Sequence, residues 1–472
     1  MFYFGLDNPV LGIAFAEGGR FTSRLPKGTY LMDHAIVGED GESPQFDWLV
    51  QPGLVVDQDV TLTIDARTAE PVSVTPPAAA ENLGVGLGYA LSGPDGPVLG
   101  AGVGLPAISG ARTAQVGALA AGYTIDGTVD TEWLGAAGEY YHLAWYPREF
   151  PVGFTKVVTR AELATVRVDV GKRVDAGGPI RFASYPAPTT NASPSAGANG
   201  IDITAPTVRT LYLTTADTVW SYGMWLSEPD GSDNSRYSSP ADKSYTAGRT
   251  YREPFNHAVF GPALPAEPNP YSLGRLQDQM ALHVHLYSDH AGNLGDNRPQ
   301  SEWTRLYAGD QLIDESPFGG IAMFSGLPAE PVDYRITTES VRKPAFTLSS
   351  SVSAEWTFRS SFVEGPEPES LPVNVLRFQP KLDQDNAAPA GTRFHVPILM
   401  QSHTGGTVVP RTLTVEASYD EGKSWRTVPV LGKRTAVLTH PADAKTVSFR
   451  ASASDAEGNT VKQTIVRAYH LR

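Results

Sequence analysis

Val461-Lys-Gln-Thr-Ile-Val-Arg467 alternates apolar and polar side chains with a period of two residues. Such alternation predicts a β-strand that buries one face. Similar runs recur along the chain at Asp59-Val-Thr-Leu-Thr-Ile-Asp65, Val208-Arg-Thr-Leu-Tyr-Leu-Thr214 and Ala281-Leu-His-Val-His-Leu-Tyr287. Turn pairs such as Asp126-Gly127 and Asp230-Gly231 separate them and permit tight hairpins. The sequence therefore predicts an all-β protein made of several β-sandwich domains.

The composition is that of a folded, multi-domain chain. Its 472 residues exceed what one core usually organises, and 46 Gly with 38 Pro favour turn-rich β architecture over helix bundles. The formal charge of 37 − 51 = −14 argues against nucleic acid as a partner. No apolar run is long enough to cross a membrane, and no signal peptide is visible near Met1. The absence of cysteine excludes disulfides and thiolate metal sites.

Proline and small-residue clusters suggest the domain boundaries. We expect a small sandwich over residues 1–75, a large β-rich middle region over 76–370 and an immunoglobulin-like sandwich over 371–472. The middle region is one or two sandwiches, with a possible break at the Ser/Ala/Gly-rich stretch 186–200. One short helix is expected from about Arg160 to Val168, because Thr159 and Glu162 can form a capping box.

Several scaffold-like segments resemble the region that follows the protease domain in large secreted subtilisin-like serine peptidases of bacteria. They include Arg24-Leu-Pro-Lys-Gly-Thr-Tyr30, His142-Leu-Ala-Trp-Tyr146, Asn256-His-Ala-Val-Phe-Gly-Pro262, Trp356-Thr-Phe-Arg-Ser360, Leu413-Thr-Val-Glu416 and Ala453-Ser-Asp-Ala-Glu-Gly-Asn-Thr460. The resemblance implies secretion and attachment to a peptidase domain, with that domain or a protein substrate as partner.

The sequence departs from that family at its catalytic motifs. No Gly-Thr-Ser segment occurs, and no His is followed by Gly. Without these local motifs, scattered Ser, His and Asp residues do not indicate a catalytic triad. We therefore expect a non-catalytic accessory region that stabilises or targets the enzyme or its substrate, with no catalytic residues of its own.

Ser418-Tyr-Asp420-Glu-Gly422-Lys-Ser424-Trp425 fits the Asp-box pattern of sialidases and related β proteins. The Ser and Asp side chains can bond backbone amides while Gly occupies a positive-φ turn position. Because the pattern stands alone here, it predicts a structural hairpin rather than a sugar-binding repeat.

Two further features suggest metal sites. His283 and His285 share a strand face, with Asp289 and His290 just beyond, so nitrogen and oxygen ligands can converge on a metal ion. The loops Asp289–Asn297 and Asp230–Asn234 are rich in oxygen ligands, as calcium loops are, but neither has EF-hand spacing. An ordinary strand surface and ordinary turns are the favoured explanations of these features, calcium is a secondary hypothesis, and no cofactor is required.

A different class of function is suggested by clustered aromatic residues. Trp220, Tyr222 and Trp225 are the residues of this cluster that we expect to stack on sugar rings if they are exposed, as in an extracellular carbohydrate- or cell-wall-binding array. Core packing is the simpler explanation. An unrecognised hydrolase is a further alternative, because two carboxylates need only be near in space.

Overall fold

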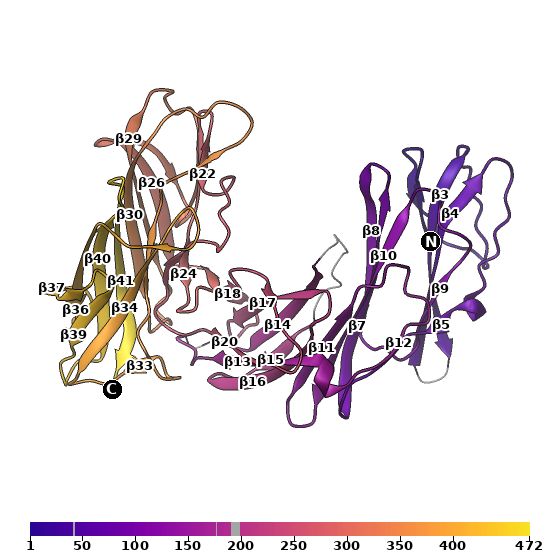
Figure 1. The fold of residues 1–472 in the computed structure, drawn as a ribbon, viewed down its shortest axis with the longest axis horizontal. Coiled ribbons are helices and arrows are strands. Elements are labelled where there is room, and N and C mark those ends of the chain that lie inside the picture. The colour runs from indigo at the N-terminus through magenta and orange to yellow at the C-terminus, as the bar shows by residue number, and fades with distance from the viewer. Residues whose placement is uncertain (41–42, 176, 190–198) are drawn as a thin grey trace.

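The computed structural model describes residues 1–40, 43–175, 177–189 and 199–472. Its described part is built from β-strands, with two single turns of 3-10 helix and no longer helix. Figure 1 shows a bent molecule, with the N-terminal strands at one end, the C-terminal strands at the other and the strands between them at the bend. The all-β prediction is confirmed.

The first sandwich packs a six-stranded sheet against one half of a seven-stranded sheet. Trp48 of the first sheet contacts Tyr89 of the second, with ring centroids 5.5 Å apart. The six-stranded sheet has the order β2 (Leu11–Ile13), β1 (Phe2–Gly5), β3 (Gly28–Asp40), β4 (Ser43–Val56), β9 (Ala111–Gln115), β5 (Glu70–Pro71), and η1 (Ala66–Thr68) precedes β5.

The expected boundary near residue 75 does not separate two sheets. Strand β9 lies between β4 and β5, pairing parallel with one and antiparallel with the other. Residues 1–75 also bury Leu31 and Trp48 against Leu87 and Tyr89 of the next sheet. The first sandwich therefore needs strands from both sides of residue 75.

The seven-stranded sheet is shared between two sandwiches. Its order is β20 (Thr250–Phe255), β13 (Leu163–Val170), β16 (Thr207–Thr214), β11 (Tyr140–Trp145), β10 (Thr124–Gly135), β7 (Ala80–Gly93), β8 (Gly96–Leu105). One half packs against the first sheet, and the β13–β16 half packs against a second six-stranded sheet through residues such as Val166, Leu211 and Phe182. That sheet has the order β15 (Ile201–Ile203), β14 (Ile180–Pro188), β17 (Thr218–Ser227), β18 (Asp233–Ser238), β25 (Leu294–Asn297), with β19 (Lys243–Ser244) beside β17, and β6 (Ser73–Thr75) pairs β12 (Thr155–Val157) nearby.

Two middle-region expectations need correction. The capping-box contacts form, because the Glu162 carboxylate accepts hydrogen bonds from both the N–H and the Oγ of Thr159 at 2.7 Å. The helix nevertheless ends after one 3-10 turn, η2 (Arg160–Glu162), because the alternating β-branched run from Leu163 continues as β13. Of the suggested break at 186–200, residues 190–198 lie outside the described part, and the flanking strands β14 and β15 pair with each other within one sheet.

The third sandwich is joined to the last by a continuous sheet. Strand β30 pairs with β41 over Ser351–Thr357 and Thr460–Val466, across the expected boundary at residue 371. The sheet has the order β27 (Gln311–Ser316), β26 (Ser301–Ala308), β29 (Val332–Val341), β30 (Ser351–Ser360), β41 (Thr460–Leu471), β40 (Thr446–Ser454), β36 (Thr412–Ser418), β37 (Arg426–Val428), with β33 (Ala387–Ala388) beside β41. Smaller sheets complete the third unit: β28 (Ile321–Phe324), β23 (Gln279–His283), β22 (Gly274–Leu276) and β31 (Glu369–Ser370) in one, β21 (Gly261–Ala263) and β24 (His285–Ser288) in the other.

The last sandwich has immunoglobulin-like topology. Its second sheet has the order β32 (Val375–Phe378), β34 (Arg393–Gln401), β39 (Thr435–Thr439), β38 (Val430–Leu431), with β35 (Thr407–Val408) beside β34. Strands β32, β34, β38 and β39 form this sheet, and β36, β40 and β41 form the other. This division matches the two sheets of an immunoglobulin-like fold, with strands A, B, D and E in one and C, F and G in the other. Phe378 and Phe449 stack across the two sheets at 4.7 Å.

One hydrophobic core cluster runs from Tyr140 to Leu471. It includes buried residues of the second, third and last sandwiches, so these units pack against one another and are not independent domains joined by flexible linkers.

Candidate functional site

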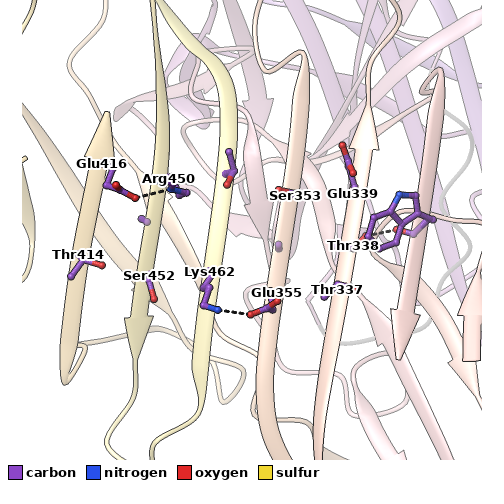
Figure 2. Close-up of a pocket in the computed structure, with 14 residues that line it drawn as sticks. Thr337, Thr338, Glu339, Ser353, Glu355, Thr414, Glu416, Arg450, Ser452 and Lys462 are labelled. Carbon is purple, nitrogen blue, oxygen red and sulfur yellow. Dashed lines mark hydrogen bonds and ion pairs between the residues drawn. The ribbon is translucent and has the colours of Figure 1, made fainter. Parts of the chain in front are cut away.

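The outer face of the nine-stranded sheet carries a shallow hollow of about 460 Å³. We call it the cross-sheet face, and it is lined by residues of six strands (Figure 2). These residues are Trp303, Thr337, Thr338, Glu339, Ser353, Ala354, Glu355, Thr414, Glu416, Arg450, Ala451, Ser452, Lys462 and Thr464. Thr338, Ala354 and Ala451 are buried, so they line the hollow with their backbone. At ~4.8 Å between strands, six strands span about 24 Å.

Strand register arranges the polar residues of the cross-sheet face in rows. One row pairs Glu339 with Ser353, and Ser353 with Thr464. The next pairs Glu355 with Lys462, whose amino group lies 2.7 Å from the carboxylate. The hydroxyl and carboxylate groups of these rows lie at the surface, where they can form hydrogen bonds with a polar ligand.

Charges on this face hold one another in their ionised forms. Arg450 Nε donates to Glu416 at 2.7 Å, which lowers the pKa of Glu416 and raises that of Arg450. The Arg450 guanidinium also lies 4.8 Å from the ring centre of Trp425. The cross-sheet face is therefore suited to binding a polar ligand through hydrogen bonds. Sequence reasoning missed it, although the polar half of each strand's alternation was the available signal.

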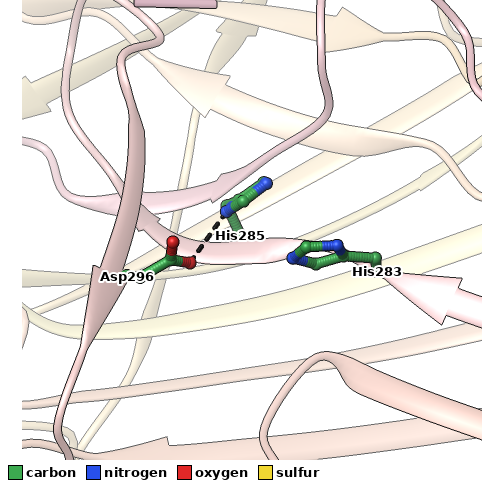
Figure 3. Close-up of side chains that lie close together, drawn as sticks. All are labelled: His283, His285 and Asp296. Atoms are coloured by element: carbon green, nitrogen blue, oxygen red, sulfur yellow. Dashed lines mark hydrogen bonds and ion pairs between the residues drawn. The ribbon is translucent and has the colours of Figure 1, made fainter. Parts of the chain in front are cut away.

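Three possible metal ligands converge elsewhere, near the bend. His283, His285 and Asp296 each offer one ligand atom, and these atoms lie within 4.8 Å of one another. His285 Nδ1 is 2.9 Å from Asp296 Oδ1, and the two imidazole rings are 4.4 Å apart (Figure 3). Burial and the neighbouring His285 lower the pKa of His283, which favours the neutral, metal-binding ring. Burial alone would raise the pKa of Asp296, but the His285 hydrogen bond and the histidine charges lower it.

Asp289 and His290, which the sequence suggested as ligands, do not join this cluster. The buried Asp289 carboxylate accepts hydrogen bonds from the N–H groups of Asn256 and Asn293, at 2.9 and 3.0 Å. Burial first, and then the charges of Arg377 and His257, lower the pKa of His290 to about 4. Asp296 takes their place, because β25 returns beside β24 after the turn at Asp289–Asn293.

The two loops considered for calcium contain ordinary turn interactions. Asp289 also accepts from the Asn293 side chain at 2.8 Å, so its oxygens are occupied by N–H donors. Asp230 accepts from the N–H and Oγ of Ser232 at 2.9 and 2.7 Å, which forms an Asx-type turn. The side chains of Asp233 and Asn234 lie outside the described part of the structure.

The Ser418–Trp425 segment forms a tight turn between β36 and β37. Gly422 N–H donates to Ser418 Oγ at 2.8 Å, and Ser424 N–H donates to Asp420 Oδ1 at 2.9 Å. Hydrogen bonds from Ser424 and Ser418 hold the pKa of Asp420 well below its usual range. Gly422 has φ +86°, and a Cβ there would lie 3.4 Å from Trp425. The polar side chains of Ser418, Asp420 and Ser424 are hydrogen-bonded within the turn.

The aromatic cluster divides between core and surface. Trp220 and Tyr222 are 0% and 1% exposed, so the expectation of sugar stacking fails for both. Trp225 lies on the opposite face of β17 and is half-buried, because successive side chains alternate along a strand. It lines a hollow of about 450 Å³ with Tyr185, Arg181 and Asp202 among others.

A Ser-His-Asp constellation occurs in the core. Ser184 Oγ lies 2.8 Å from His142 Nδ1, and His142 Nε2 lies 3.9 Å from Asp130 Oδ1. None of the three is more than 2% exposed, and burial raises the pKa of Asp130. A substrate carbonyl cannot reach Ser184 in this conformation, so the constellation is not an accessible triad.

Comparisons with known proteins give no family. No family model and no curated protein matches the chain. Among solved structures, Escherichia coli alpha-2-macroglobulin activated by porcine elastase aligns at 11% identity over 84% of this chain and 43% of that one, with a TM-score of 0.15. The N-terminal eight immunoglobulin domains of Down Syndrome Cell Adhesion Molecule align at 10% identity over 98% of this chain and 69% of that one, also at 0.15. At these scores neither likeness bears on function.

Within the described ranges, no helix has the length and apolar character needed to cross a membrane.

Proposed function

We propose that this chain is a non-catalytic scaffold that holds a partner protein at a fixed position, as an accessory region of a secreted subtilisin-like serine peptidase. The peptidase parentage and the extracellular location rest on the sequence resemblance. The scaffold role is supported by the architecture.

Sharing of sheets between sandwiches is the observation that carries the proposal. The seven-stranded sheet belongs to two sandwiches, and the nine-stranded sheet crosses from the third to the last. Each crossing is a ladder of backbone hydrogen bonds, as between β30 and β41, rather than a linker. Units joined in this way cannot swing independently, which suits a protein that sets the distance between two partners.

The cross-sheet face supplies a surface for such a partner. It combines hydroxyl groups with the Glu355–Lys462 and Glu416–Arg450 pairs, and Trp303 lies at one end. Polar rims with a few aromatic anchors are common at non-obligate protein interfaces. We expect a peptidase domain or its protein substrate to dock there.

Serine-directed labelling tests the non-catalytic part of the proposal. The purified chain is incubated with a fluorophosphonate and analysed by intact mass, with Ser184→Ala as the matched variant. We expect no adduct on either protein, since Ser184 is fully buried. Stoichiometric labelling that disappears in Ser184→Ala would show a working nucleophile and overturn the proposal.

Parentage is tested separately by the reading frame that precedes the codon for Met1. A subtilisin-type protease segment in the same frame supports the accessory role. An unrelated in-frame segment contradicts it.

A second function, carbohydrate binding, is favoured by the hollow around Trp225. A half-buried indole beside Tyr185, with Arg181 and Asp202 in reach, resembles the mixture of aromatic and polar groups that holds sugars. Retention on insoluble polysaccharides tests it. Binding lost in Trp225→Ala but kept in Trp425→Ala supports the sugar site, and no retention of the wild type removes it.

A further inference from the structure

The cluster of His283, His285 and Asp296 brings together three different sheets. His283 ends β23 of a four-stranded sheet, His285 begins β24 of a two-stranded sheet, and Asp296 lies in β25 at the edge of a six-stranded sheet. Val284 breaks the strand between the two histidines. A ligand bound by all three side chains would therefore connect elements that backbone pairing leaves separate.

The three side chains form an almost complete coordination shell. Figure 3 shows the outer nitrogen of the His283 ring directed toward His285 and Asp296. Zinc bonds of about 2.1 Å in tetrahedral geometry place ligand atoms roughly 3.4 Å apart. The His285–Asp296 contact of 2.9 Å and the limit of 4.8 Å for the other pairs bracket this spacing. Small side-chain rotations suffice to close the shell.

One ring nitrogen of His283 makes no hydrogen bond in the described part of the structure and is therefore available to bind a metal ion. Its Nε2 atom is buried and has no hydrogen-bond partner among the described residues. A buried ring nitrogen without a partner destabilises the folded chain, and coordination to a metal ion would satisfy it. The Asp296 side chain is 58% exposed, so water can reach the open side of the cluster and supply a fourth ligand.

We propose that His283, His285 and Asp296 bind one zinc ion, which fastens β23 and β24 to β25 at the bend of the molecule. Two imidazoles and one carboxylate suit a borderline ion such as Zn²⁺ rather than Ca²⁺ or Mg²⁺, which prefer oxygen ligands. The ion joins the second sandwich, through β25 and β18, to the third. The proposal concerns how these strands are held together, and it does not depend on the peptidase parentage.

Calorimetric titration of the metal-free chain with ZnCl₂ tests the proposal. We expect one ion per chain, with affinity reduced at least tenfold in His283→Gln and in Asp296→Asn. His395→Ala is the matched control, since His395 is an exposed histidine of β34 far along the chain. Its affinity should equal that of the wild type.

Two further readouts separate zinc binding from misfolding. Saturating Zn²⁺ should raise the Tm of the wild type by roughly 5 °C, whereas equal Ca²⁺ or Mg²⁺ should not. Near-ultraviolet circular dichroism checks that each variant is folded. Absence of stoichiometric zinc binding by the wild type overturns the proposal. Unchanged affinity in folded Asp296→Asn does so too.

Discussion

At the scale of single residues, buried histidines make stability depend on pH. His440 is 1% exposed and lies between two tyrosine hydroxyls, with Tyr419 3.1 Å from Nδ1 and Tyr469 3.2 Å from Nε2. Burial lowers the pKa of His440 to about 4. The folded state therefore keeps the ring neutral where the unfolded chain, with a pKa of about 6.5, already binds a proton.

Stability from His440 is present above pH 6.5 and is lost as the pH falls toward 4. We expect this residue to lower the free energy of unfolding of the last sandwich by about 2 kcal/mol between pH 7 and pH 5. Urea unfolding of the wild type and His440→Gln at both pH values measures it. A pH dependence of equal size in the variant would contradict the assignment to His440.

Gly422 fixes the turn between β36 and β37 by its backbone conformation. Its φ of +86° is unfavourable for residues with a Cβ, whereas the space is sufficient, since a Cβ would lie 3.4 Å from Trp425. Gly422→Ala should lower the free energy of unfolding by about 1–2 kcal/mol. Lys433→Gly is the control: Lys433 has φ +54°, so glycine there should leave stability unchanged or increase it. Equal destabilisation by both changes would show that φ is not the cause.

At the scale of elements, β30 stabilises two sandwiches at once. Trp356 at its centre is fully buried, and its Nε1–H donates to the carbonyl of Asn374 at 2.8 Å, beside the start of the last sandwich. Trp356→Ala should lower the free energy of unfolding by about 3–5 kcal/mol. Because β30 pairs with both β29 and β41, the loss should appear in both sandwiches.

Hydrogen exchange followed by mass spectrometry measures that loss strand by strand. In Trp356→Ala we expect faster exchange in β29 and in β41. Trp425→Ala, which removes a half-buried indole at the sheet edge, should affect only the adjacent turn. Faster exchange confined to β29 and β30 would mean that the sheet does not couple the two units.

Local alternation predicted the strands but could not reveal which neighbours cover them. Trp220 and Tyr222 share the inward face of β17 while Trp225 points outward, a difference that the even and odd positions already encode. The capping box at Thr159 and Glu162 formed, yet the β-branched run after it decided the structure. A capping box indicates where a helix can begin, but it does not show whether the residues after it will pack as a helix or as a strand.

The cluster of His283, His285 and Asp296 shows a contact that closeness in sequence does not predict. His283 and His285 were found because they are close in the chain, whereas Asp296 is eleven residues beyond His285 and reaches it only through the hydrogen-bonded turn at Asp289. Asp289, although nearer in sequence, is buried among backbone N–H donors. The cross-sheet face was invisible for the same reason, since register between strands far apart in the chain creates it.

At the scale of the whole molecule, the expected boundaries near residues 75 and 371 are crossed by strand pairing. Composition marks where loops lie but does not show whether the strands on either side enter one sheet. A hydrophobic cluster that is continuous from Tyr140 to Leu471 adds side-chain packing to these ladders. Because this packing joins the second sandwich to the third, we expect the bend in Figure 1 to be kept in solution.

The central claim is that the sandwiches are held at one spacing, and a distance distribution tests it most directly. Because the chain has no cysteine, spin labels can be placed at Val55→Cys in β4 and Leu431→Cys in β38, which are 59% and 55% exposed. Val409→Cys with Leu431→Cys, within the last sandwich, gives the width due to the labels alone. Double electron–electron resonance should show a single peak for the long pair, about as narrow as for the short pair. A broad or multi-peaked distribution for the long pair alone would contradict the fixed scaffold.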